Sequence, residues 1–173
     1  NTDTGLKGYD YTYDALNRIK TASGLSTTNY DVSNISYDRN GNILTLNRKG
    51  HINSIATSFD NMDVLTYSYS GNQLTIVEDT ANDQYGFKDD AIGIPDTSLD
   101  YNYDDNGNLI SDTNKTITNI TYNYLNLPVS IDFNSGNISY HYDASGKKLR
   151  KTYSTDGRVM EYAGTNVYEN GQF

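Results

Sequence analysis

Apolar and polar residues alternate along most of this chain, in short segments that each end in a polar turn. The stretch ISYDRNGNIL, residues 35–44, is typical: Ile35 and Tyr37 alternate with polar residues, and an Asn-Gly pair precedes Ile43. A period of two places the apolar side chains on one face of a β-strand. An Asn-Gly pair between two such segments is a strong hairpin signal, because both residues accept positive φ angles. The pattern therefore predicts antiparallel β-structure.

The same pattern is repeated along the chain. Each copy has an apolar residue, two tyrosine positions spaced two apart, a polar turn and a returning aliphatic residue, and six copies begin at Tyr9, Ser33, Leu65, Leu99, Ile120 and Ile138. The tyrosines assigned to the shared strand face are Tyr11, Tyr13, Tyr37, Tyr67, Tyr69, Tyr101, Tyr103, Tyr122, Tyr124, Tyr140 and Tyr142. A lone hairpin is marginal in water, so neighbouring hairpins must cover each other's rings. We therefore predict an all-β fold, in which successive hairpins form a continuous, twisted or spiral, open antiparallel sheet.

The residues after the tyrosines are suited to tight turns. A short Asp side chain can accept hydrogen bonds from turn amides, and Gly accepts the positive φ angles that hairpin turns require. The residues assigned to the turns are Asp14, Asp38, Gly41, Gly71, Asp104, Gly107, Asp143 and Gly146. The copy that begins at Ile120 has neither Asp nor Gly after its tyrosines, so the sequence defines its turn least well.

The formal charge of −9 is unevenly distributed. Residues 78–105 hold nine acids and one Lys, whereas residues 147–158 hold five basic residues and one acid. The segment 78–98 also contains Gly and Pro, which predicts an acidic loop or cap within a single module that spans residues 1–173. An acidic surface disfavours nucleic acid, although the basic segment could contact a phosphate locally. Apolar runs are too short for membrane insertion.

Catalytic and cofactor chemistry have little support in the sequence. The chain has no Cys, and its only histidines are His51 and His141. No spacing typical of hydrolase, metalloprotease or phosphate-loop motifs occurs, although many acids leave a glycosidase carboxylate pair open. The segment 104–108 has oxygen ligands at alternate positions but lacks the distant bidentate acid of an EF-hand. We predict that the protein is not an enzyme and has no cofactor or bound metal.

Carbohydrate binding is the alternative function. Tyrosines on a rigid sheet can stack against sugar rings, while Asn and Asp side chains bond sugar hydroxyls. The candidates outside the repeat template are Tyr30, Tyr85, Tyr153, Tyr162 and Tyr168. Edge strands of the predicted sheet could also pair with a second chain.

The segments YDYTYDALNRI, YDRNGNI, YDDNGNL and YHYDASGKKLRK resemble the YD repeat of the Rhs family, in a form similar to that of gut Bacteroidetes, over residues 9–156. In that family the repeats wind into a spiral sheet that forms a hollow shell, and in bacterial members the shell encloses a C-terminal toxin. The core segment with its autoproteolytic aspartates is not visible here. The resemblance implies a section of shell wall from a secreted or cell-surface protein. Its partners would be the remainder of its own longer chain and a C-terminal toxin cargo.

Overall fold

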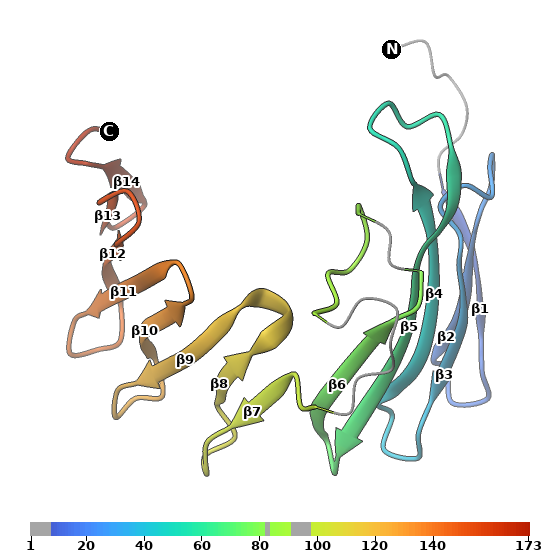
Figure 1. The fold of residues 1–173 in the computed structure, drawn as a ribbon, viewed down its shortest axis with the longest axis horizontal. Coiled ribbons are helices and arrows are strands. Elements are labelled where there is room, and N and C mark those ends of the chain that lie inside the picture. The colour runs from blue at the N-terminus through green and yellow to red at the C-terminus, as the bar shows by residue number, and fades with distance from the viewer. Residues whose placement is uncertain (1–7, 82–83, 91–97) are drawn as a thin grey trace. The chain divides into compact units, whose positions relative to one another are not determined.

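The computed structural model describes residues 8–81, 84–90 and 98–173, and it confirms the all-β prediction. The described residues contain fourteen strands and one short 3-10 helix, η1 (Thr113–Lys115). The chain forms two compact units, residues 1–98 and residues 99–173. Each unit contains one antiparallel sheet (Figure 1).

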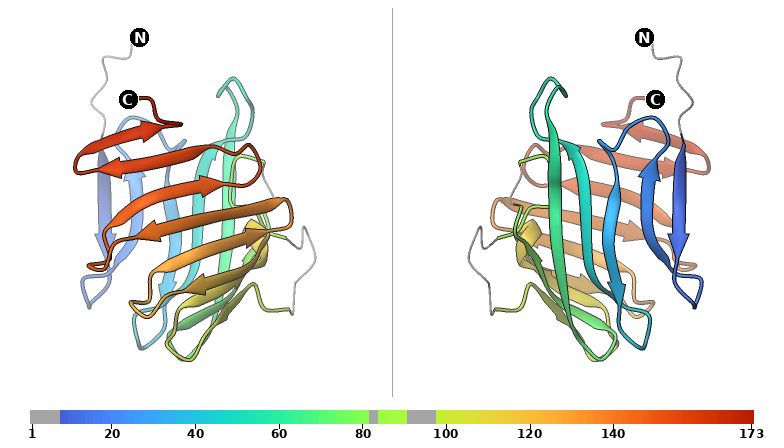
Figure 2. Two further views of the ribbon diagram at one scale, coloured as in Figure 1. Left: turned by 90° about the vertical axis from the view of Figure 1, so that its left-hand side faces the viewer. Right: turned by 90° about the vertical axis from the view of Figure 1, so that its right-hand side faces the viewer.

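The first unit contains a six-stranded sheet in which strands neighbour each other in chain order. Its strands are β1 (Tyr9–Tyr13), β2 (Ile19–Gly24), β3 (Val32–Tyr37), β4 (Ile43–His51), β5 (Phe59–Ser70) and β6 (Gln73–Asp79). The second unit contains an eight-stranded sheet that also follows chain order, as Figure 2 shows. Its strands are β7 (Tyr101–Tyr103), β8 (Leu109–Asp112), β9 (Ile117–Tyr122), β10 (Pro128–Phe133), β11 (Gly136–Tyr142), β12 (Lys148–Tyr153), β13 (Val159–Ala163) and β14 (Asn166–Glu169).

The sequence predicted one continuous sheet, whereas the described strands form two sheets. The segment between them was predicted to be an acidic loop or cap near residues 78–98. Strand β6 extends through Asp79, and residues 84–90 contain turns but no strand. Residues 82–83 and 91–97 of that segment lie outside the described residues. The single module over residues 1–173 stays a prediction.

The predicted hairpins form with a common register. In the first hairpin, Tyr11 pairs with Ala22, and the register shifts at Tyr13 so that Tyr13 lies opposite Ile19. The same shift beside the turn pairs Tyr37 with Ile43 and Tyr103 with Leu109. A β-bulge of this kind absorbs the extra residue of an odd-length loop and increases the local twist. The last tyrosine and the returning residue therefore share one face of the sheet.

Most template tyrosines are half-buried rather than fully buried. Of the described residues, the buried apolar side chains are Ala22, Met62, Leu65, Val77, Tyr101 and Ile120. On the edge strand β1, Tyr11 is 50% exposed and Tyr13 is 54% exposed. Half-burial leaves the phenol hydroxyls at the margin of the packed face, where they can reach a neighbouring hairpin or solvent.

Candidate functional site

The hairpin turns are built around one acceptor side chain. In the turn 38–42, Asp38 Oδ1 accepts hydrogen bonds from the backbone N–H groups of Asn40 and Asn42, both at 2.8 Å. Asp38 Oδ2 accepts a third hydrogen bond from Asn42 Nδ2 at 2.8 Å. The backbone N–H of Gly41 donates to the Asp38 carbonyl, and Gly41 has a φ of 93°. This is the three-residue hairpin loop with a left-handed residue before the returning strand.

Four other turns repeat this arrangement. Their acceptor side chains, Asp14, Asp104, Asn123 and Asp143, each bind the backbone N–H groups two and four residues later. The left-handed positions are Asn17, Gly107, Asn126 and Gly146. The structure thus brings the predicted turn residues Asp14, Asp38, Gly41, Asp104, Gly107, Asp143 and Gly146 into equivalent places.

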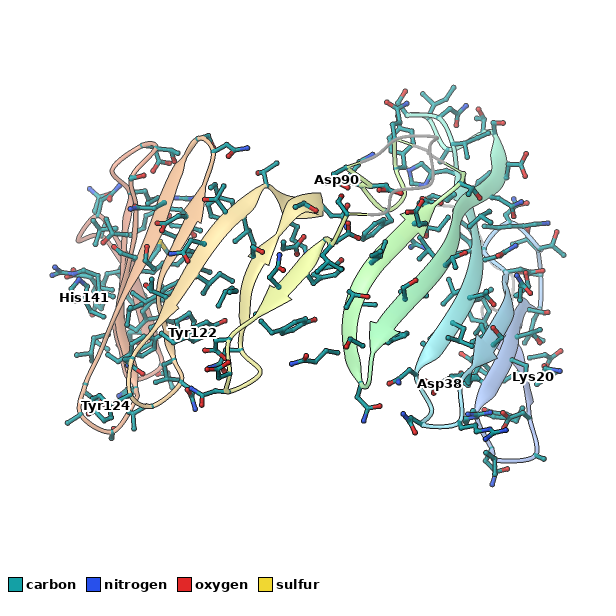
Figure 3. All side chains as sticks on the ribbon, turned by 60° about the horizontal axis from the view of Figure 1, so that its bottom comes forward. Lys20, Asp38, Asp90, Tyr122, Tyr124 and His141 are labelled. Carbon is teal, nitrogen blue, oxygen red and sulfur yellow. The ribbon has the colours of Figure 1, made fainter. Side chains whose placement is uncertain are left out.

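The copy with the least defined turn corrects one prediction. Asn123 takes the acceptor role of Asp, so strand β9 ends at Tyr122 and Tyr124 lies within the turn. The assignment of Tyr124 to a strand face is therefore wrong. Its side chain is 83% exposed and projects from the turn in Figure 3. The signal that identifies this register is Asn123 itself, because a carboxamide oxygen can accept the same two amide hydrogen bonds.

The remaining template hairpin has a different turn. Ser70 pairs with Gln73 across the two residues Gly71 and Asn72, and Gly71 has a φ of 63°. Glycine at the first central position is typical of a type II′ turn, which matches the twist of the flanking strands. Gly71 therefore has the turn role predicted for it, in a loop without an acceptor side chain.

Hydrogen bonds lower the pKa of the turn carboxyls. For Asp104 the largest cause is the Asn108 side chain, and for Asp143 it is the Ser145 side chain. The backbone N–H of Arg18 is the largest cause for Asp14. A carboxylate with a lowered pKa remains charged at neutral pH and keeps its acceptor role.

In four hairpins, the hydroxyl group of the last strand tyrosine forms a hydrogen bond with the preceding hairpin. Tyr37 Oη donates to the carbonyl of Ile19 at 2.7 Å, and Tyr69 Oη donates to that of Ile43 at 2.8 Å. In the second unit, Tyr122 Oη donates to Leu109 O at 2.6 Å. The fourth bond joins Tyr142 Oη to Pro128 O at 2.9 Å. We call these four hydrogen bonds the tyrosine latches.

The acceptors of the tyrosine latches occupy one structural position. Ile19, Ile43, Leu109 and Pro128 are the first residues of β2, β4, β8 and β10, the returning strands of the preceding hairpins. Burial raises the pKa of Tyr122 and Tyr142, which keeps both phenols protonated as donors. The latches therefore fix the stagger between successive hairpins through side chains as well as through the backbone ladder.

Neighbouring turns also contact each other. Asn72 Oδ1 accepts hydrogen bonds from Asn40 Nδ2 at 3.0 Å and Asn42 Nδ2 at 3.1 Å. In the second unit, Asn126 Oδ1 accepts a bond from Asn108 Nδ2 at 3.1 Å. Asparagine suits this position because its amide both donates and accepts. These bonds extend the hairpin interface from the strands to the turns.

Buried carboxylates are a feature that the sequence analysis missed. The least exposed side chains among the described residues, each 1% or 2% exposed, are those of Asp63, Asp79, Asp100 and Asp112. Asp63 forms an ion pair with Arg48 and accepts a hydrogen bond from the backbone N–H of Phe87 at 2.7 Å. Strand alternation could have indicated Asp63, because it has the same parity as Leu65, Tyr67 and Tyr69.

The other candidate residues have structural partners. The rings of His51 and Tyr85 lie 4.8 Å apart, and Tyr30 and Tyr168 contact Phe59 and Phe173. Tyr153 and Tyr162 lie beside basic side chains. His141 projects from β11 in Figure 3.

The described residues contain neither a metal-binding cluster nor a membrane-spanning helix. No group of three or more His, Asp or Glu side chains among them could hold a metal ion. Both carboxylate oxygens of Asp104, in the segment considered for calcium, accept hydrogen bonds inside the turn. Over the same residues, no helix has the length and apolarity needed to cross a bilayer.

No protein-family model matches the chain, and no curated protein matches it.

Proposed function

We propose that this chain is a non-enzymatic structural module, a section of hairpin wall in a secreted or cell-surface protein of the Rhs type. In such a protein the wall would enclose a C-terminal toxin domain. The observation that carries the proposal is the tyrosine latch, which recurs at the same place in four hairpin interfaces. A repeated side-chain bond between identical units is what a self-supporting wall requires.

The energetics support a mechanical role. A net hydrogen bond contributes about 0.5–1.5 kcal/mol, so a single latch has a modest effect. Among the described strands, the main contacts join strands that neighbour each other along a sheet, so small terms add from one interface to the next. The tyrosines supply both half-buried apolar surface and the hydroxyl donor, which explains why Tyr rather than Phe or Leu is used in the repeats.

The test is protection of an enclosed segment in the full-length protein that contains this chain. Replacing Tyr37, Tyr69, Tyr122 and Tyr142 together with Phe removes the four hydroxyl donors and keeps the rings. We expect limited proteolysis to cut segments that the native wall protects, while circular dichroism still reports β-structure. The control is Tyr13→Phe, because Tyr13 Oη forms no hydrogen bond with the described residues.

Two results would contradict the proposal. One is a protease pattern of the quadruple variant that is the same as that of the native protein. The other is turnover by the isolated chain in a glycosidase and esterase screen, which would assign it a catalytic role instead.

A further inference from the structure

The basic side chains of segment 147–158 take no part in the tyrosine latches or in the side-chain bonds between turns. Strand β12 presents its basic residues to both faces of the sheet. Arg150 lies opposite His141 and forms an ion pair with Glu161 at 2.7 Å, which neutralises that face. Arg158 Nε lies 3.7 Å from Asp156 Oδ2, and Arg158 Nη1 lies 3.9 Å from Glu169 Oε1. Two arginines of the segment are therefore close to carboxylates.

Lys148 and Lys151 differ from these arginines. Both lie on the tyrosine face, because Lys151 pairs with Tyr140 and Lys148 pairs with Tyr142. Neither forms an ion pair with a carboxylate of the described residues. Both side chains are half-buried, so the ammonium groups are held against the sheet. In a chain with a net charge of −9, two such ammonium groups without a carboxylate partner need an explanation.

Each of the two ammonium groups lies near two tyrosine rings. Lys148 Nζ lies 4.6 Å from the centre of the Tyr162 ring, and Lys151 Nζ lies 4.4 Å from that of Tyr153. Both also flank Tyr140, at 5.8 Å and 5.9 Å from its ring centre. Ring faces attract cations but accept few of the three hydrogen bonds that each ammonium can donate. The remaining donors point to a ligand that accepts hydrogen bonds and is negatively charged.

We propose that Lys148 and Lys151, whose ammonium groups lie over the rings of Tyr140, Tyr153 and Tyr162, form a binding site for a tetrahedral oxyanion, a sulfate or phosphate group. A tetrahedral oxyanion offers several acceptor oxygens and can bridge two ammonium groups. A carboxylate has one charge and two oxygens, and so matches fewer of these donors. The Tyr153 side chain raises the pKa of Lys151 by hydrogen bonding, so that ammonium stays charged at neutral pH. The ring faces are occupied by cations, so the site binds the anionic group rather than stacking a sugar ring.

The first experiment is titration of the full chain with inorganic sulfate and with inorganic phosphate. Ionic strength is held constant at about 0.15 M with chloride. Interactions between exposed charges more than roughly 8 Å apart are then screened. We expect saturable chemical-shift changes at the lysine Nζ groups and at the Tyr140, Tyr153 and Tyr162 rings. The double variant Lys148→Met, Lys151→Met removes both ammonium donors and should weaken binding by at least about tenfold.

Matched variants separate the site from general charge. Lys147→Met removes an exposed neighbouring ammonium, and Arg150→Met removes a cation from the other face; both should bind as the native chain does. Lys148→Arg with Lys151→Arg should retain binding. Absence of saturable binding in the native chain would overturn the proposal, as would equal weakening in the Lys147→Met variant. Melting curves of every variant confirm that it is folded.

The source of the anion is tested separately. A sulfated polysaccharide and vesicles of neutral lipid with added anionic phospholipid are compared as competitors of inorganic sulfate. Displacement by the polysaccharide assigns a glycan sulfate, and displacement by the vesicles assigns a lipid phosphate. Competition that persists in the Lys148→Met, Lys151→Met double variant would show binding elsewhere and would overturn the assignment.

Discussion

The two units build the same hairpin but stabilise it differently. In the first unit, β4 and β5 have 9 and 12 residues, and they carry the Arg48–Asp63 ion pair beside buried Met62 and Leu65. In the second unit the strands have between 3 and 7 residues. There, part of the tyrosine face is lined by lysines over rings. The turn with its acceptor side chain and the tyrosine latch occur in both units.

The turns and the tyrosine latches occur in both units and belong to the repeat, whereas the Arg48–Asp63 ion pair belongs to one hairpin interface. Turns and latches depend on residues at fixed spacing, so they recur in most copies of the repeat. Long strands provide a wider face, and in the first unit this face buries the Asp63 carboxylate of the Arg48–Asp63 ion pair. Local sequence patterns therefore define the repeated hairpin, while longer strands allow a region of higher local stability.

Removing the buried Asp63 carboxylate should have the largest effect on stability. Asp63→Ala leaves the Phe87 N–H and the Arg48 guanidinium without their acceptor. Breaking a buried pair can cost 3–5 kcal/mol, but the Arg48 side chain is 45% exposed and regains water. We expect a loss of about 2–3 kcal/mol in the unfolding free energy of the first unit alone. Hydrogen exchange during urea unfolding, followed strand by strand, measures the loss in each unit.

The control for this variant is Asp10→Ala, since Asp10 is exposed on β1 and its side chain forms no hydrogen bond or ion pair with the described residues. Equal destabilisation of both units by Asp63→Ala would contradict the idea that the ion pair stabilises one unit locally.

Removing a single latch hydroxyl should destabilise the chain less than Asp63→Ala does. The loss of unfolding free energy should be about equal in the two units. Each of Tyr37→Phe, Tyr69→Phe, Tyr122→Phe and Tyr142→Phe removes one donor from a carbonyl acceptor. We expect about 1 kcal/mol from each change, measured by chemical unfolding of the single variants. Tyr13→Phe is the matched control and should change stability little. A loss confined to one unit would show that the latch is not a general device of the repeat.

Lowering the pH should distinguish turns with Asp from the turn with Asn. The pKa of Asp104 and Asp143 is lowered in the folded chain, so their stabilising effect is complete above the ordinary carboxyl pKa and is lost as pH falls through the folded pKa. Asn123 has no such group. In an NMR titration from about pH 7 to about pH 2, the amides of Asn108 and Lys147 should shift markedly, and the amide of Leu127 much less. Similar shifts at all three amides would mean that the carboxylates are not responsible.

The range of each interaction along the chain decides whether the feature it stabilises could be predicted from the sequence. Alternation and turn residues act over a few positions, so the hairpins and most turn residues could be predicted. Tyr124 was assigned wrongly because the sequence pattern allows either Tyr122 or Tyr124 as the last tyrosine of the strand. The hydrogen bonds of Asn123 show that the strand ends at Tyr122. Asp63 and Asp79 bind Phe87 and Val64, which lie far away in sequence. No local pattern contains those contacts, and the same holds for the break between the two sheets.

Replacing Asp79 should have the smallest effect and the opposite sign. Asp79 Oδ1 accepts bonds from the N–H groups of Val64 and Ala81, whereas the buried Oδ2 has no hydrogen-bond partner among the described residues. Burial raises the pKa of Asp79, and the charges of Asp63 and Asp89 add to this effect. A raised carboxyl pKa favours the folded state at low pH, and this contribution is lost as pH rises through the folded pKa. Asp79→Asn keeps an acceptor oxygen and removes the charge, so it should raise the melting temperature near about pH 7 and change it less near about pH 4. A lower melting temperature near neutral pH, with Asp10→Asn unchanged, would show instead that the charged form of Asp79 stabilises the first unit.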